Sequence, residues 1–416
     1  MMKKWFTLAL TSVLVFSCLT VTSAKQPHNQ KEHGKKFELG VDVLLHEQKD
    51  LIKGKRVGLV TNPTGVDKDL HSIVDLFAHD SDFKLTALYG PEHGVRGDAQ
   101  AGAYVDFYTD SETGLPVYSL YGKTQKPTPE MLKDVDVLVF DIQDVGTRFY
   151  TYIYTMAYLL EAAKENGKKV IVLDRPNPIG GTQVEGPVLD ASKYSSFIGK
   201  YAIPLRHGMT VGELANLFNT EFRIGADLTV VKMKGWKRDM YYDDTPLQFI
   251  MPSPNMPTLD TAVVYPGAGL FESTNLSEGR GTTRPFELIG APYIDGTKLA
   301  NALNNQNLPG VTFRATSFSP TFSKHMNLFI NGVQIHVTDR EKFNSVKTGL
   351  VMIKTIHDMY PNDFQFINGN NFELHIGIES VRQDLLNGIS VDEIEKKWQP
   401  ELKKFMKTRE KYLLYK

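Results

Sequence analysis

Three short apolar runs in the first half of the chain each end directly in a polar loop, and this recurrence limits the possible folds most strongly. The runs are residues 85–88, 137–140 and 170–173. Segments with helical spacing separate them, a pattern typical of parallel βαβ units whose helices cover both faces of a sheet. Because the carboxyl ends of parallel strands meet at one edge, we expect the three polar loops to converge there.

The sequence therefore predicts an α/β fold with two parts. The chain has 416 residues, which exceeds the usual size of a single core. We predict a Rossmann-like, doubly wound, mostly parallel sheet over residues 38–260, followed by a smaller α+β domain over residues 261–416. Within these domains we expect an amphipathic helix at residues 70–77 and a hairpin whose two-residue turn is Asn331-Gly332, because that pair tolerates positive φ.

Two further helix signals lie in the first domain. Residues 150–166 carry apolar side chains at helical spacing, and Gly167 is well placed to end this helix. Thr210 and Glu213 form a capping-box signature for another helix, because each side chain can bind a backbone N–H near the other residue.

The N-terminus has the features of a secretory signal peptide. Two lysines precede a largely apolar run over residues 5–21, which ends in small residues. We predict a signal peptide over residues 1–24, a disordered leader over residues 25–37, and a secreted, cell-wall-associated mature chain with no transmembrane span. A lipid on Cys18 is the alternative, but the three residues before it match poorly the pattern that precedes a lipidated cysteine.

Several function classes lack their sequence signatures. The 47 basic and 48 acidic residues nearly cancel, unlike the strong basic charge of nucleic-acid-binding domains, so no nucleic acid is expected as a partner. The chain has neither a dinucleotide fingerprint after its first strand nor a phosphate loop, so we expect no nucleotide cofactor. It also lacks metal-ligand spacing and a Gly-x-Ser-x-Gly elbow, so no metal or other cofactor is predicted.

Loop carboxylates remain as the groups that can carry chemistry. They favour glycoside hydrolysis, in which one carboxylic acid protonates the leaving oxygen and a second carboxylate acts as base or nucleophile. Glu92 is the predicted acid, because Pro91 stiffens its loop and the apolar strand before it favours partial desolvation. The alternative is a structural role for Glu92, either in an ion pair with Arg96 or as a cap of the next segment. The candidate carboxylates are Glu92, Asp141, Asp144, Asp174, Glu185, Glu272 and Glu278.

Glu185 is the predicted second catalytic carboxylate, because Gly186 and Pro187 leave little side-chain bulk beside it. Asp144 is the third catalytic candidate, since it lies further into its loop than Asp141, which directly follows a strand. Loop arginines can bind an anionic substituent in a bidentate way, and loop amides can contact a ligand. The predicted substrate-binding residues are His93, Arg148, Arg175, Asn177, Asn255, Glu278, Arg280 and Arg284.

Seven motifs in order resemble the exo-β-N-acetylmuramidases of the NamZ type. They span almost the whole mature chain, and their order is more specific than any one of them. The motifs lie at residues 91–97, 141–152, 174–178, 184–187, 206–210, 252–258 and 275–283.

This resemblance implies an exo-acting glycosidase that removes β-linked N-acetylmuramic acid from the non-reducing end of peptidoglycan fragments. It also implies a cleft in a Rossmann-like domain, with Glu92 as the most secure catalytic position and Glu185 next. Muramyl glycans carry a lactyl carboxylate, which would give the loop arginines a purpose. Two alternatives stay open: an extracytoplasmic protein that binds a glycan or anionic sugar without cleaving it, and an amidase or esterase acting on wall peptides.

Overall fold

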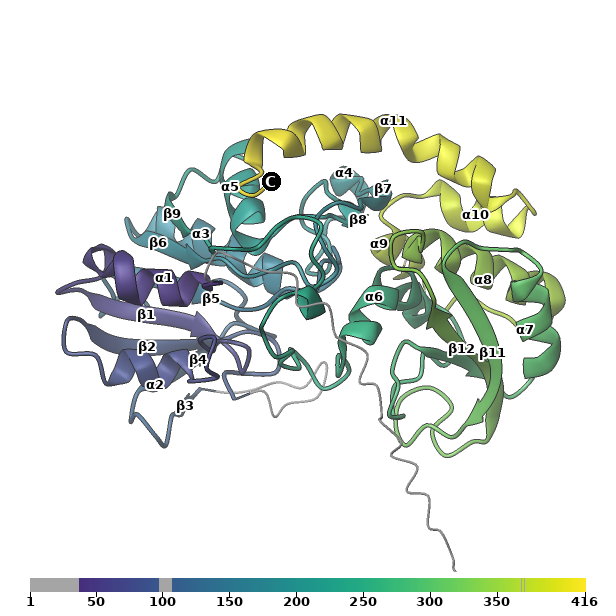
Figure 1. Ribbon diagram of the computed structural model, residues 1–416, viewed down its shortest axis with the longest axis horizontal. Coiled ribbons are helices and arrows are strands. Elements are labelled where there is room, and N and C mark those ends of the chain that lie inside the picture. The colour runs from purple at the N-terminus through teal and green to yellow at the C-terminus, as the bar shows by residue number, and fades with distance from the viewer. Residues whose placement is uncertain (1–36, 97–106, 368, 370) are drawn as a thin grey trace, which may run out of the picture. The chain divides into compact units, whose positions relative to one another are not determined.

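A seven-stranded sheet forms the centre of the N-terminal part of the computed structural model (Figure 1). Its strands run in the order β3-β4-β2-β1-β5-β6-β9, and every neighbouring pair except β3-β4 is parallel. This confirms the predicted Rossmann-like α/β class. The strands are β1 (Arg56–Thr61), β2 (Lys84–Gly90), β3 (Tyr108–Thr109), β4 (Pro116–Ser119), β5 (Val137–Asp141), β6 (Lys169–Leu173) and β9 (Asp227–Val231).

The structure describes residues 37–96, 107–367, 369 and 371–416. The predicted signal peptide, Cys18 and all but the last residue of the predicted leader therefore lie outside the described residues. Within the described ranges, no helix combines the length and the apolar character that crossing a membrane requires.

Helices cover both faces of the large sheet because alternate strand residues point to opposite sides. Val137 and Val139 of β5 belong to one core cluster with α1 (Gly40–Glu47) and α2 (Ile73–Ala78). Leu138 and Phe140 belong to the other cluster, with α3 (Tyr152–Glu165) and α5 (Val211–Glu221). Both faces being buried explains why the strands read as continuous apolar runs.

The helix signals of the first domain were partly confirmed. In the capping box of α5, the Glu213 amide donates to Thr210 Oγ1 at 3.2 Å, and the Thr210 amide donates to Glu213 Oε2 at 3.0 Å. The predicted helix at residues 70–77 starts later, at Ile73, because the Ser72 hydroxyl caps it. Leu70 has a φ of 69°, which no α-helix contains.

A three-stranded antiparallel sheet in the order β10-β12-β11 organises the C-terminal part. The predicted Asn331-Gly332 hairpin turn is wrong, because both residues lie inside β12. A Cβ on Gly332 would sit 2.0 Å from the Ile289 carbonyl oxygen, so this glycine serves close strand approach. The elements are α6 (Leu259–Ala268), β10 (Leu288–Ala291), α7 (Gly296–Asn304), β11 (Val311–Phe318), β12 (Ile330–Val337) and α8 (Ser345–Met359).

A long C-terminal helix, α11 (Val391–Arg409), connects the two parts of the chain. It packs on α8 and on the strand β7 (Glu185–Val188), and Figure 1 shows its C-terminal end beside α5. The tail continues the contact, since the Tyr415 hydroxyl donates to Asp174 Oδ2 at 2.6 Å. All described residues belong to one compact unit, and the predicted boundary at residue 260 stays a prediction.

Smaller elements complete the described chain. They are β8 (Pro204–Arg206), which pairs with β7, the helices α4 (Ala191–Tyr194), α9 (Asn371–Ile376) and α10 (Ser380–Leu386), and the 3₁₀ turns η1 (Lys49–Leu51), η2 (Tyr242–Asp244), η3 (Gly269–Ser273) and η4 (Glu410–Tyr412).

Candidate active site

The candidate site begins at the tight turn that follows β2. The Gly94 amide donates to the Pro91 carbonyl oxygen at 2.9 Å. His93 and Gly94 have φ values of 75° and 77°, a region that residues with a side chain rarely adopt. Such backbone strain persists where the surroundings fix it and is concentrated at functional sites. The turn sets Glu92 and His93 into the wall of a pocket.

This pocket gathers side chains from loops that are far apart in the sequence. Four loops contribute most of them: the turn after β2, the segment leading into α3, the proline-rich loop before α6, and η3 with the loop after it. The pocket is lined by Glu92, His93, Tyr121, Phe149, Tyr150, Thr151, Tyr152, Phe197, Ile198, Ser253, Asn255, Met256, Tyr265, Glu272, Arg280 and Phe286.

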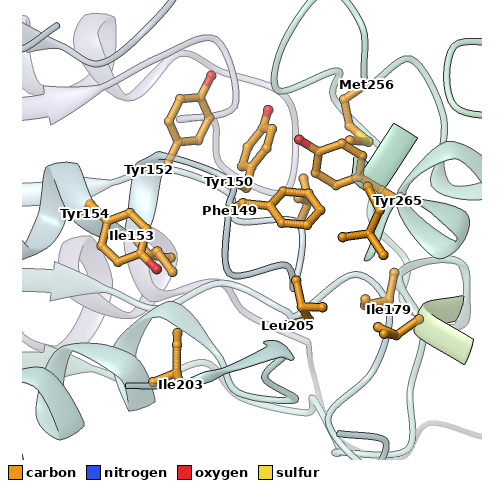
Figure 2. Packing of buried hydrophobic residues seen from close by; sticks show 14 of the residues in the cluster. Phe149, Tyr150, Tyr152, Ile153, Tyr154, Ile179, Ile203, Leu205, Met256 and Tyr265 are labelled. Atoms are coloured by element: carbon orange, nitrogen blue, oxygen red, sulfur yellow. The ribbon is translucent and has the colours of Figure 1, made fainter. Parts of the chain in front are cut away.

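Aromatic rings form much of the pocket wall, and Figure 2 shows Phe149, Tyr150 and Tyr265 close together. The Tyr265 ring centroid lies 5.0 Å from that of Phe149 and 6.0 Å from that of Tyr150, both edge to face. Phe286 contacts Tyr265 in the same manner at 4.6 Å. Packed rings of this kind present fixed apolar faces and a few hydroxyls, which is typical of small-molecule pockets.

Glu92 lies among hydroxyl groups at this pocket. The Thr151 hydroxyl donates to Glu92 Oε2 at 3.1 Å. Burial, followed by the charge of Glu92, raises the pKa of the Tyr121 phenol to about 12, so Tyr121 stays protonated at neutral pH. Both groups are hydrogen-bond donors that can orient the Glu92 carboxyl.

A second carboxylate, Glu272, lies in the same pocket in a strongly cationic environment. Arg280 Nη2 donates to Glu272 Oε1 at 2.5 Å, and His375 Nε2 lies 3.3 Å from Glu272 Oε2. Burial, the largest single influence, would raise the pKa of Glu272. The Arg280 charge and the contact with His375 outweigh it and lower this pKa to about 2. Glu272 is therefore ionised throughout the physiological range.

Tyr265 links the charged groups of the site. Its pKa is raised well above the usual value, by burial first and then by the Glu272 charge. Glu92 and Glu278 raise it further, whereas Arg280 lowers it. Three carboxylates and one guanidinium therefore surround a single phenol.

The structure brings some of the predicted site residues together. Glu92, His93, Asn255 and Arg280 all line the pocket. Glu278 lies behind it, with Oε1 at 3.4 Å from Arg280 Nε. Asn255 is buried and its Nδ2 has no hydrogen-bond partner within the described residues, so this amide nitrogen is available as a donor to a ligand.

The other two predicted catalytic acids are not among the residues that line this pocket. Glu185 begins β7, where its Oε1 lies 2.5 Å from Arg206 Nη1 and its Oε2 accepts from the Val346 amide at 3.0 Å. Asp144 Oδ2 lies 3.1 Å from His207 Nε2 and accepts from the Gly146 amide at 2.8 Å. Both carboxylates are buried. Each oxygen of Glu185 has a protein partner, so a structural role accounts for Glu185 where it lies. Asp144 Oδ1 has no hydrogen-bond partner within the described residues.

Three of the predicted arginines also bind protein groups. Arg175 is buried in a bidentate pair with Asp141, at 2.6 and 2.7 Å. Arg148 is buried against backbone carbonyl oxygens, including that of Pro187 at 3.1 Å, and burial lowers its pKa to about 10. Arg284 pairs with Glu287 at 3.2 Å outside the pocket lining.

Asn177, the other predicted ligand amide, stabilises a backbone turn. Its Nδ2 donates to the Met209 carbonyl oxygen at 3.0 Å, and its Oδ1 accepts from the Ile179 amide at 3.1 Å. Both ends of this side chain are therefore used within the protein.

The sequence interpretation did not single out several residues of the pocket. Glu272 was one of seven loop carboxylates, and nothing in its neighbourhood favoured it, because the decisive contacts come from Arg280 and from His375, 103 residues away. Tyr265 lies on α6, and no sequence motif singled it out. No group of three potential metal ligands occurs in the described part of the chain.

Two family models match the chain, one over residues 57–260 and one over residues 263–415. They describe the N-terminal and C-terminal parts of the exo-β-N-acetylmuramidase NamZ. The chain belongs to the NamZ family. A curated relative from Bacillus subtilis (strain 168), described as peptidoglycan β-N-acetylmuramidase NamZ, is 60% identical over 415 residues, covering 100% of both chains.

Two solved structures from Bacteroides fragilis NCTC 9343 are similar to this NamZ-family chain. Both are described as DUF1343 family proteins. The first has a TM-score of 0.85 and 43% identity, covering 91% of this chain and 99% of that one. The second has a TM-score of 0.75 and 33% identity, covering 92% of this chain and 99% of that one.

Proposed function

We propose that this protein is a glycoside hydrolase that releases β-1,4-linked N-acetylmuramic acid from the non-reducing end of peptidoglycan fragments. Membership of the NamZ family and the activity for which the Bacillus subtilis relative is named support the reaction class. The observation that carries the proposal is a pocket in which two glutamates, Glu92 and Glu272, have different surroundings.

The two carboxylates suit the two roles of glycoside hydrolysis. Arg280 and His375 keep Glu272 ionised, as a base, a nucleophile or a stabiliser of positive charge at the anomeric carbon must be. Glu92 accepts a hydrogen bond from the Thr151 hydroxyl and lies beside the Tyr121 phenol, and we assign it the proton transfer to the glycosidic oxygen. Glu272 thus replaces Glu185 and Asp144 as our proposed second acid.

The rest of the pocket suits a substituted sugar. The Asn255 amide nitrogen, which has no hydrogen-bond partner in the part of the chain that the structure describes, can donate to an oxygen of the substrate, such as an acetamido carbonyl. The faces of the aromatic rings can pack against the C–H groups of a pyranose. Among the four predicted anion-binding arginines, Arg280 is the one at the pocket, so we assign it any direct contact with the lactyl carboxylate.

We further propose that the protein acts outside the cytoplasm, in turnover and recycling of the cell wall. The basic start, apolar run and small-residue end of residues 1–24 support export. N-terminal sequencing of the protein recovered from culture medium tests this point, and a mature chain that begins near Lys25 is expected. Recovery of the intact Met1 terminus from the cytoplasm would contradict it.

The enzymatic proposal is tested with N-acetylmuramyl-β-1,4-N-acetylglucosamine. Purified protein is incubated with the disaccharide, and free N-acetylmuramic acid is measured by chromatography with mass detection. Release of the monosaccharide is expected, and Glu272→Gln should abolish it. Binding of the disaccharide without release would instead identify a glycan-binding protein.

The position of attack is tested with longer fragments. An exo-acting enzyme should remove one N-acetylmuramic acid from a muramic-acid-terminated chain and then stop, because the next sugar of the alternating glycan is N-acetylglucosamine. It should leave chains that end in N-acetylglucosamine unchanged. Internal cleavage products would contradict the proposed end specificity.

A further inference from the structure

Lys324 reaches the charged groups of the site from a separate loop, residues 319–329 between β11 and β12. Its Nζ donates to the carbonyl oxygens of Phe271 at 2.8 Å and Thr274 at 2.9 Å, and it lies 2.7 Å from Glu278 Oε2. An ammonium group has three protons, and two of them go to these carbonyl oxygens, while its charge faces the Glu278 carboxylate. One lysine thus ties together both ends of the segment that carries Glu272 and Glu278.

This lysine completes a chain of alternating charges. Glu278 is 3% exposed at its side chain, and each of its oxygens faces one cation, Lys324 on Oε2 and Arg280 on Oε1. Arg280 in turn holds Glu272 at 2.5 Å. The negative charges of Glu272 and Glu278 are therefore balanced by the positive charges of Arg280 and Lys324. Without Lys324, Glu278 would compete with Glu272 for the single guanidinium.

The loop backbone holds an unusual conformation on either side of the lysine. Ser323 and His325 have φ values of 68° and 59°, in the region that L residues rarely adopt. Contacts with the site segment fix this conformation. The Thr321 amide donates to the Gly281 carbonyl oxygen at 2.9 Å, and His325 Nε2 lies 2.7 Å from the Asn275 carbonyl oxygen.

We propose that Lys324 is a positioning residue for the hydrolysis: it fixes Glu278 and the segment from residue 271 to 278, and so leaves Arg280 to pair with Glu272. The inference rests on the proposed function. Lys324 is not among the residues that line the pocket, so it acts through Arg280 and the backbone of η3, not through the substrate.

Loss of the Lys324 charge should also change the pH dependence of kcat. The charged and titratable groups around Glu272 are Arg280, His375, Tyr265, Glu278, Glu92 and, through Glu278, Lys324. Removing one positive charge leaves a net negative surplus in a partly buried cluster. The ionised form of Glu272 is then less favoured, and protonation should reach it at a higher pH.

The test compares three purified variants on the same disaccharide: Lys324→Met, Lys324→Arg and the control Lys298→Met. Lys298 lies on α7, is largely exposed and pairs only weakly with Asp295 at 3.4 Å. For Lys324→Met we expect kcat to fall about 10–100-fold with a smaller change in KM. The acid limb of kcat should move up by about 0.5–1 pH unit.

Lys324→Arg keeps the charge but replaces the compact ammonium group with a larger, planar guanidinium, which cannot reproduce the placement of one nitrogen between two carbonyl oxygens and a carboxylate. It should therefore restore the acid limb and only part of kcat, and it keeps the test available if Lys324→Met does not fold. The inference would be overturned if Lys324→Met had the wild-type kcat and the wild-type pH profile on the acid side. It would also be overturned if Lys324→Arg had the full wild-type kcat. Wild-type protein that releases no N-acetylmuramic acid would overturn the proposed function instead.

Discussion

The substitution Glu92→Gln separates proton donation from every other role of this side chain. A positioned general acid contributes about 10²–10⁴-fold to a rate, which equals about 2.7–5.4 kcal/mol of transition-state free energy. We expect a loss of kcat in this range on N-acetylmuramyl-β-1,4-N-acetylglucosamine. Glutamine keeps the size and an acceptor oxygen for the Thr151 hydroxyl, 3.1 Å away. The free energy of unfolding should therefore change by no more than about 0.5 kcal/mol.

The leaving group provides the decisive comparison. A 4-nitrophenolate leaves without a proton, so its release does not need a general acid. The fold-loss of activity caused by Glu92→Gln should therefore be at least about ten times smaller on 4-nitrophenyl β-N-acetylmuraminide than on the disaccharide. Both rates are measured for wild type, Glu92→Gln and the control Glu130→Gln, whose side chain is exposed beside Lys133. Equal losses on the two substrates would refute proton donation by Glu92, and a large drop in the unfolding midpoint would indicate a structural role.

Three further substitutions test other parts of the structure. Arg280→Met should raise the pKa of Glu272, because the Arg280 charge then no longer outweighs the effect of burial. On acidification, the variant should therefore lose activity at a higher pH than wild type does. Superimposable pH profiles would contradict this. Asn255→Ala should lower kcat/KM about fivefold, because one hydrogen bond contributes about 1 kcal/mol, and it should leave the stability unchanged. Unchanged kinetics would show that this amide does not bind the substrate. Gly332→Ala should destabilise the protein by about 1–3 kcal/mol, because the added Cβ would meet the Ile289 carbonyl oxygen. Urea unfolding measures this change. An unchanged midpoint would show that β10 and β12 can move apart to accommodate the Cβ.

The interior of the large sheet was predictable because its signals are local. Apolar runs such as residues 137–140, separated by helical segments, are typical of strands buried on both faces of a parallel sheet. The capping box of Thr210 and Glu213 lies within four residues, so its geometry follows from the helix itself. The Asn331-Gly332 prediction failed because the same dipeptide serves a tight turn or a close strand contact. The neighbouring strand β10, some 40 residues earlier in the chain, decides which of the two occurs.

The location of the site was also partly predictable. Glu92 and His93 follow a buried strand directly, and a parallel sheet places such residues at its carboxyl edge. Arg175 and Asn177 follow another strand in the same way but bind protein groups. Sequence position shows that a polar group lies at the sheet edge. It does not show whether that group faces a neighbour or a cavity.

The sequence alone therefore determined the class of fold, the family, the strands β2, β5 and β6 and the sheet edge at which Glu92 lies, because each follows from local periodicity or from motifs. Only the tertiary structure decided which acid shares the pocket of Glu92. Glu185 and Glu272 are both loop carboxylates in the sequence, but Arg206 pairs with the first inside the protein, whereas the second lines the pocket. The physical reason is that Coulombic and hydrogen-bond energies depend on distance in space, and folding sets those distances between residues that are far apart along the chain.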